Sequence, residues 1–173
     1  EVSASEETAG KITATSVFSV LQGQGITQKL QVALVTGRLV IIPDDLIAQL
    51  VAYSLGKSIR ISVDHFTKLE GYEGFSYASG AQSLMSDLLF GCTQCLLHGQ
   101  LKVIVGTGSL LGEGWDCPSI NSLVLASQIG SFVSTNQMRG RAIRIDQADN
   151  KKVANIWHLA TYEETLIGGG NDF

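Results

Sequence analysis

The sequence predicts a single-domain α/β fold with a mostly parallel sheet. Its 173 residues lie within the usual range for one domain, and 45% of them are hydrophobic, which is enough for a sizeable core. Short apolar segments, expected as strands, alternate with longer segments that carry helix signals. The segment LKVIVGT, 101–107, is almost continuously apolar, as in parallel strands that are covered on both faces.

Four segments are expected to be helices. The first follows Ser5, an N-cap candidate with two acids after it, so we read 1–25 as an N-terminal helix and linker. The second begins at Pro43, again with two acids, and ends at Gly56. The expected helices are 5–25, 43–56, 81–99 and 136–146.

The expected strands are short runs rich in β-branched or other apolar residues. The run 68–80 contains three glycines and is expected to be a loop. The expected strands are 29–36, 38–42, 58–63, 101–107, 121–127 and 152–160.

Composition narrows the class of function. A net charge of −4 argues against a protein that binds nucleic acid with its whole surface. We find no apolar segment long enough for a membrane span and no signal peptide. Three cysteines do not make a disulfide framework, so a reducing cytoplasm is the expected setting. Because the sequence begins at Glu1 without methionine, we expect it to be a piece of a longer protein.

Two stretches look like phosphate loops but lack required residues. GKS at 56–58 would need a glycine where Val51 stands, and an expected helix precedes it instead of following it. VGTGSLLGEG at 105–114 has Leu111 where a dinucleotide fingerprint needs its third glycine. Neither stretch is expected to hold a nucleotide by itself.

Cys92, Cys95 and His98 follow one another at intervals of three, which places them on one face of a helix. Three such ligands could hold zinc, but the sequence has no second CxxC pair. Free cysteine is among the most buried residue types, so we interpret these residues as core packing and predict no metal site.

The segment NQMRGRAIRID, 136–146, concentrates three arginines in an acidic chain. As a helix it would place Gln137, Arg141 and Arg144 on one face. Gly140 inside that helix would cost about 1 kcal/mol relative to alanine, which suggests a close approach to the backbone there. Two guanidiniums on one face suit a multiply charged anion. From spacing alone, an anion site and a solvated charged face with salt bridges remain equally open.

Two motifs carry a resemblance to a known family. QMRGRAIR, 137–144, resembles the Q-x-x-G-R-x-x-R pattern called motif VI in superfamily 2 helicases. VGTGSLLGEGWDCP, 105–118, resembles motif V, in the variant found in excision-repair helicases and in translocating subunits of type III restriction enzymes. KKVANIWHLA, 151–160, is similar to the strand that follows motif VI. Before residue 100 the resemblance is only architectural, and no clear motif IV strand is found.

The resemblance implies that residues 1–173 are the second RecA-like domain of a DEAD/DEAH-box-type helicase, with a three-layer α/β/α fold. ATP and Mg²⁺ would bind in a cleft shared with the first RecA-like domain of the same chain. That first domain would supply the Walker A lysine and the acidic Mg²⁺ motif, so this chain alone is expected to be inactive. The expected nucleic acid is DNA rather than RNA.

The resemblance also assigns residues. Arg141 and Arg144 match arginine fingers that stabilise charge on the transferring phosphoryl group. Thr107 and Gly106 match the part of motif V that touches the nucleic-acid backbone. The positions that match nucleotide-binding residues are Gln137, Gly140, Gly114 and Asp116.

The sequence leaves two other functions as alternatives. A RecA-like domain without catalysis could act as a protein-interaction module, although the intact arginines argue against this. An enzyme for a small nucleotide would need its own phosphate loop, and none is found.

Overall fold

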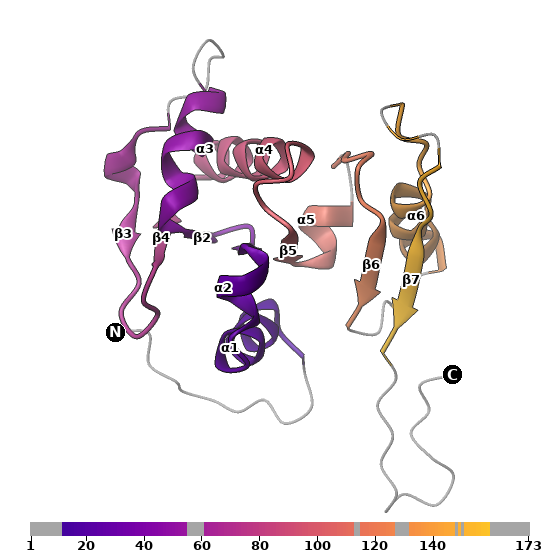
Figure 1. Ribbon diagram of the computed structural model, residues 1–173, viewed down its shortest axis with the longest axis horizontal. Coiled ribbons are helices and arrows are strands. Elements are labelled where there is room, and N and C mark those ends of the chain that lie inside the picture. Colours follow the sequence, from indigo (N-terminus) through magenta and orange to yellow (C-terminus); the bar gives the residue numbers. More distant parts are fainter. Residues whose placement is uncertain are drawn as a thin grey trace, which may run out of the picture.

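The structure is a computed structural model, and it describes residues 12–54, 61–112, 115–126, 132–147, 149 and 151–159. The fold is mixed α/β (Figure 1). We divide it into an N-terminal part, residues 12–106, and a C-terminal part, residues 107–159. No helix in the described ranges is both long and apolar enough to cross a membrane.

A five-stranded sheet organises the N-terminal part, with the strand order β3-β4-β2-β1-β5. Only β1 and β5 run parallel, while the other neighbouring pairs are antiparallel. The expectation of a mostly parallel sheet is therefore wrong for this sheet. The strands are β1 Val32–Val35, β2 Leu39–Pro43, β3 Thr67–Lys68, β4 Phe75–Ser79 and β5 Val103–Gly106.

Short connections explain two of the three antiparallel pairs, β1–β2 and β3–β4, because a parallel pair needs a crossover of roughly a dozen residues or more. Residues 36–38 alone join β1 to β2, and Thr36 Oγ1 accepts a hydrogen bond from the Leu39 amide at 2.9 Å. The run 68–80, expected as a loop, instead contains a hairpin between β3 and β4. Its turn includes Gly71 and Gly74, whose φ angles of 78° and 81° favour glycine.

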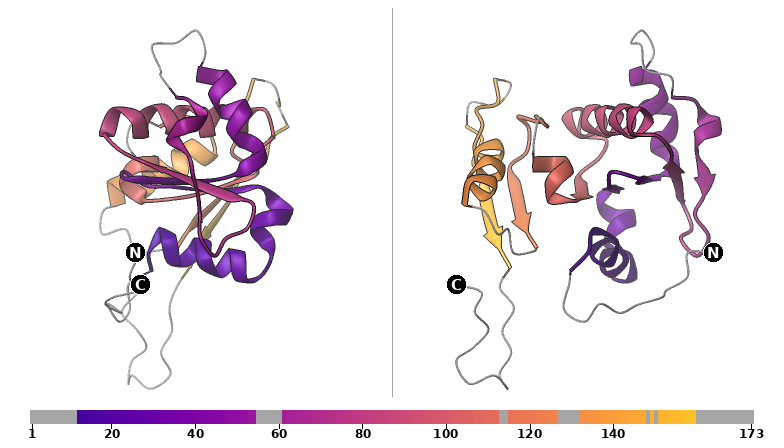
Figure 2. Two further views of the ribbon diagram at one scale, coloured as in Figure 1. Left: turned by 90° about the vertical axis from the view of Figure 1, so that its left-hand side faces the viewer. Right: turned by 180° about the vertical axis from the view of Figure 1, so that it is seen from behind.

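Helices cover both faces of this sheet (Figures 1 and 2). Residues of α1 (Ala14–Gly23) pack on one face, where α2 (Ile26–Leu30) also contacts β1. On the other face, η1 (Asp44–Leu46) leads into α3 (Ile47–Ser54), which packs against α4 (Gln82–Leu97). The helix expected at 81–99 is thus confirmed as α4, and the helix expected at 43–56 is found as η1 and α3, although Pro43 itself ends β2.

Strand alternation builds two hydrophobic clusters. Val32 and Leu34 point to the face that holds Phe18, whereas Ala33 and Val35 point to the face that holds Leu50. All six side chains are essentially excluded from water. The sheet is therefore sealed on both sides, as a buried strand such as β1 requires.

Two expected elements differ at their ends. Helix α1 begins after Thr13, whose hydroxyl accepts a hydrogen bond from the Ser16 amide in a capping box, and Ser5 lies outside the described residues. Residues 58–60 of the strand expected at 58–63 also lie outside them. The described end of that segment is not a strand, because Val63 starts the short helix η2, Val63–His65.

The C-terminal part is a smaller α/β unit. It contains α5 (Gly108–Gly112), β6 (Ser122–Leu125), α6 (Phe132–Ala142) and β7 (Asn155–His158). The strands predicted at 121–127 and 152–160 are confirmed, and they pair in parallel as a separate two-stranded sheet. Helix α6 lies along this two-stranded sheet, and α5 lies between the two-stranded sheet and the N-terminal part (Figures 1 and 2).

Candidate functional site

Helix α6 presents the arginine-rich segment. Its buried side chains are Met138 and Ala142, and Met138 Cε lies 3.4 Å from where a Cβ on Gly108 would be. Arg139 and Arg141 occupy the last turn, where positive charge complements the carbonyl end of a helix. The apolar stripe thus docks α6 against the start of α5 and fixes where the arginines lie.

Arg141 ties α6 to the segment that resembles motif V. Its Nη1 donates to the carbonyl oxygens of Leu111 at 2.8 Å and Trp115 at 2.5 Å. The side chain is partly buried. Hydrogen bonds from a guanidinium are charge-assisted and stronger than neutral ones, so Arg141 fixes the path of the chain after α5.

Arg144 forms an ion pair with Asp116. The expectation that Arg144 shares a helix face with Arg141 is wrong, because α6 ends at Ala142 and Arg144 lies two residues beyond it. Both guanidiniums nevertheless reach the same segment, 111–118. The side chains of Arg144 and Asp116 are 54% and 52% exposed, and surface pairs of this kind contribute only about 0–1 kcal/mol. The pair can therefore open at little cost.

Lys152 is a third cation here, which the sequence reasoning missed. Its Nζ donates to the carbonyl oxygens of Pro118 at 2.5 Å and Arg144 at 2.9 Å. The only sequence signal for Lys152 was its position at the start of the last expected strand. This position does not distinguish it from a solvated lysine. We call Arg141, Arg144, Lys152 and Asp116 the arginine cluster.

The structure gives three different outcomes for the four positions that the resemblance matches to nucleotide-binding residues. Asp116 lies in the arginine cluster. Gln137 and Gly140 are exposed, and a Cβ added at Gly140 would meet no atom within 4 Å. Nothing described in the chain therefore accounts for the glycine. Gly114 lies outside the described residues.

Gly106 and Thr107 shape the turn from β5 into α5. A Cβ at Gly106 would lie 2.6 Å from Leu111 Cδ1 and 3.1 Å from the Val35 carbonyl oxygen, so close packing explains this glycine. The Thr107 carbonyl accepts hydrogen bonds from the amides of Leu110 and Leu111, both at 3.1 Å. This turn brings Leu111 to Arg141.

Trp115 contacts the N-terminal part. Its indole Nε1 donates to Thr93 Oγ1 at 2.9 Å, and the Thr93 hydroxyl in turn donates to the Leu89 carbonyl at 2.7 Å. Helix α4 and Arg141 thus hold the segment after α5 from two sides.

The cysteines of α4 behave as core residues. Cys92 and Cys95 are fully buried, whereas His98 is exposed. Burial raises the pKa of the Cys92 thiol strongly and raises the pKa of Cys95 to about 11, so both stay protonated near neutral pH. Within the described ranges no group of three or more His, Cys, Asp or Glu side chains could hold a metal ion.

The arrangement concentrates cations around a short segment at the surface. Arg144 is half exposed, and Arg141 and Lys152 already hold the backbone carbonyls beside it. A multiply charged anion that approached here could take the place of Asp116 on Arg144. Comparison of the sequence and structure with family models, curated proteins and solved structures found no match.

Proposed function

We propose that the chain is the second RecA-like domain of a superfamily 2 helicase or translocase. It would supply Arg141 and Arg144 to an ATP site completed by a first RecA-like domain. DNA is the proposed strand. The proposal includes a RecA-like arrangement of the whole chain, which the two layers of helices and the parallel β6–β7 pair support.

One observation carries the proposal. The segments that resemble motifs V and VI are far apart in sequence, yet Arg144 pairs with Asp116 and Arg141 binds the Trp115 carbonyl. A motor that couples nucleotide hydrolysis to movement on nucleic acid needs these two motifs in contact. Arginines on a solvated charged face would not need contacts with the motif V segment.

The ion pair suggests how Arg144 would act. In the chain alone, Asp116 neutralises Arg144 at the surface. A γ-phosphate presented by the first domain carries more charge than one carboxylate and accepts forked hydrogen bonds, so it would compete for Arg144. Asp116 would then be released toward the nucleotide. When bound, ATP with Mg²⁺ supplies the phosphoryl group that is transferred.

The test is Arg144→Ala in the protein that joins this chain to its first RecA-like domain. We expect DNA-stimulated ATP turnover to fall by about 10³-fold or more, because the finger stabilises charge that develops in the transition state. The effect should lie mainly in kcat, and DNA affinity should change little. Arg144→Lys should restore little activity, since lysine loses the forked geometry.

Arg139→Ala is the matched control. Arg139 is exposed in the last turn of α6 and points away from Arg141, so we expect turnover within a few fold of the parent. Unfolding measurements should place Arg144→Ala within about 1 kcal/mol of the parent, as for a surface ion pair. Equal damage by Arg139→Ala and Arg144→Ala, or loss of DNA binding with normal turnover, would contradict the proposal.

A second function, a protein-interaction module without catalysis, is favoured by the exposed apolar residues of the C-terminal part. Phe132 and Ile145 are each 80% exposed, and Trp157 is 61% exposed. Such side chains commonly mark interaction surfaces. If the protein shows no ATP turnover that depends on Arg144, while Trp157→Ala abolishes binding of a partner protein, this second function is the correct one.

A further inference from the structure

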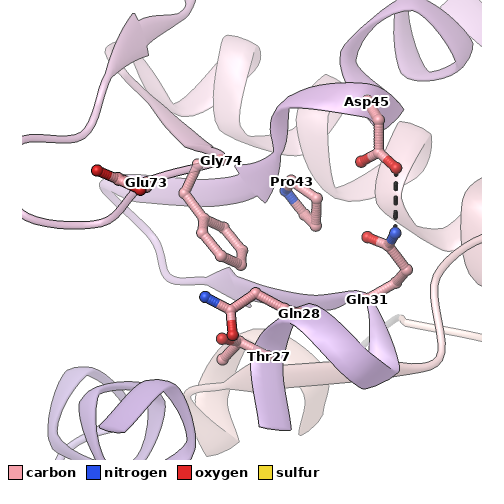
Figure 3. A pocket seen from close by; sticks show the side chains of 8 residues that line it. Thr27, Gln28, Gln31, Pro43, Asp45, Glu73 and Gly74 are labelled. Carbon is pink, nitrogen blue, oxygen red and sulfur yellow. Dashed lines mark hydrogen bonds between the residues drawn. The ribbon is translucent and has the colours of Figure 1, made fainter. Parts of the chain in front are cut away.

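A small pocket lies in the N-terminal part between α2, the end of β2 and the β3–β4 hairpin (Figure 3). Its volume is ≈ 140 Å³, and none of its lining residues belongs to the arginine cluster. A protein cavity of about 150 Å³ is large enough for benzene. The pocket therefore suits a ligand of about six non-hydrogen atoms.

Thr27 gives the pocket an unpaired polar group. Its side chain is fully buried, and its hydroxyl has no hydrogen-bond partner in the described structure. Buried hydroxyls are almost always paired, so an orphan that lines a pocket points to a missing polar group. The neighbouring Gln28 is exposed, lines the same pocket and lies beside Thr27 (Figure 3). Because the Thr27 hydroxyl is closed to water, a ligand reaches it only when the Gln28 side chain moves aside.

Phe75 and Pro43 give the pocket a rigid apolar wall. Both are buried, and the Phe75 ring packs edge-on against Phe18 with ring centroids 5.6 Å apart. Because these side chains are held in place, they do not collapse into the empty pocket. It favours a ligand with a short hydrocarbon body.

The opening of the pocket is acidic. Asp45 and Glu73 are exposed carboxylates on opposite sides of the view in Figure 3, and the lining includes no lysine or arginine. Gln31 Nε2 donates to Asp45 Oδ2 at 3.1 Å. The Gln31 backbone has a φ of 49°, the left-handed conformation that commonly ends a helix, and Gln31 is the residue that ends α2 here.

We propose that this pocket binds a short amino alcohol. The neutral hydroxyl end would pair with Thr27, the hydrocarbon body would pack on Phe75 and Pro43, and the ammonium would remain at the opening beside Asp45 and Glu73. This orientation follows from solvation, because burying a neutral hydroxyl with a partner is far less costly than burying an ammonium.

Three probes of equal size test the proposal on the intact chain. These are 4-aminobutan-1-ol, pentan-1-amine, which lacks the hydroxyl, and pentan-1-ol, which lacks the ammonium. Titration followed by backbone amide NMR should show millimolar binding of 4-aminobutan-1-ol, with shifts around Thr27 and Gly74. Each of the other two probes should bind roughly 3–10-fold more weakly, the loss expected for one polar interaction.

Two variants separate the role of the Thr27 hydroxyl from that of the carboxylates at the opening. Thr27→Val should remove the advantage of 4-aminobutan-1-ol over pentan-1-amine, and Glu73→Gln should remove part of its advantage over pentan-1-ol. Glu70→Gln, in the same hairpin but outside the lining, should change nothing. Equal affinity of 4-aminobutan-1-ol and pentan-1-amine for the parent, an unchanged preference in Thr27→Val, or no shifts at the pocket up to tens of millimolar would overturn the proposal.

Discussion

The two parts of the molecule both contain a pair of parallel strands, but they bury it very differently. In the N-terminal part, every residue of β1 is fully buried between two layers of helices. In the C-terminal part, Leu125 is the buried residue of β6, and β7 has only exposed and partly buried positions. Parallel strands are normally covered on both faces. Among the described helices, α6 contacts both strands of the β6–β7 pair.

The uncovered side chains are large and apolar. Val124 and Trp157 face each other in register across β6 and β7, and they are 55% and 61% exposed. The other strongly exposed apolar residues of the C-terminal part are Phe132, Val133, Ile143, Ile145, Val153 and Leu159. The arginine cluster thus lies in the part with the least burial, and segments that move on binding are commonly drawn from such low-stability regions.

The largest difference between the two parts should be the loss in free energy of unfolding caused by a Leu→Ala substitution in each part. Leu50→Ala removes a side chain that is 0% exposed at the centre of the larger hydrophobic cluster. We expect the free energy of unfolding to fall by about 2–5 kcal/mol, because the cavity cannot fully collapse. Urea unfolding followed by circular dichroism would measure it.

Leu159→Ala is the matched change in the C-terminal part, where Leu159 is 58% exposed. Its effect on the free energy of unfolding should stay within about 0.5 kcal/mol, as for other surface substitutions. A loss similar to that of Leu50→Ala would mean that the open face of β6–β7 is covered in solution.

The sequence predicted local structure best where one segment carries its own signals. Helix α4 and strand β5 lie where their apolar runs placed them. Strand direction was not predictable in this way, because it depends on which strands meet. The 68–80 run was misjudged because Gly71 and Gly74, taken as signs of a loop, are the turn of a hairpin.

The candidate site shows the same limit. Periodicity placed Gln137 and Arg141 on α6, but it carried the helix past Ala142 and so put Arg144 on the wrong element. The partners of these arginines are carbonyl groups and Asp116 from a segment distant in sequence. Which backbone carbonyl a guanidinium meets depends on tertiary packing, and no local pattern encodes it. The unpaired hydroxyl of Thr27 likewise had no sequence signal.

A smaller contrast comes from two buried threonines. Thr93 joins the two parts, since its hydroxyl donates to Leu89 and accepts from Trp115. We expect Thr93→Val to lower the free energy of unfolding by about 1–3 kcal/mol, because the indole N–H loses its partner. Chemical denaturation would report the loss, and tryptophan fluorescence would report release of Trp115.

Thr27→Val should act in the opposite direction. It removes a fully buried hydroxyl that has no partner in the described structure, so the free energy of unfolding should rise by up to about 1 kcal/mol. The measurement should be made without amines or alcohols in the buffer. Destabilisation equal to that of Thr93→Val would show that the Thr27 hydroxyl is paired in solution.

The smallest contrast concerns two glycines inside helices. A Cβ at Gly91 of α4 would lie 2.6 Å from Cγ of the buried Leu50, so Gly91→Ala should destabilise the chain despite its gain in helix propensity. A Cβ at Gly140 of α6 would lie in open space. Gly140→Ala should therefore raise the free energy of unfolding by about 0.5–1 kcal/mol, measured by urea titration.

Gly140→Ala also tests why the glycine is there. Packing within the described chain gives no reason for it, so the proposed motor offers one: a ligand approaches the α6 backbone at that turn. In the protein that includes the first RecA-like domain, we then expect Gly140→Ala to be more stable yet slower in DNA-stimulated ATP turnover, as when a stabilising change fills space that function needs. Unchanged turnover would show that nothing approaches Gly140 closely. A loss of stability would instead mean that the space beside Gly140 is filled in solution.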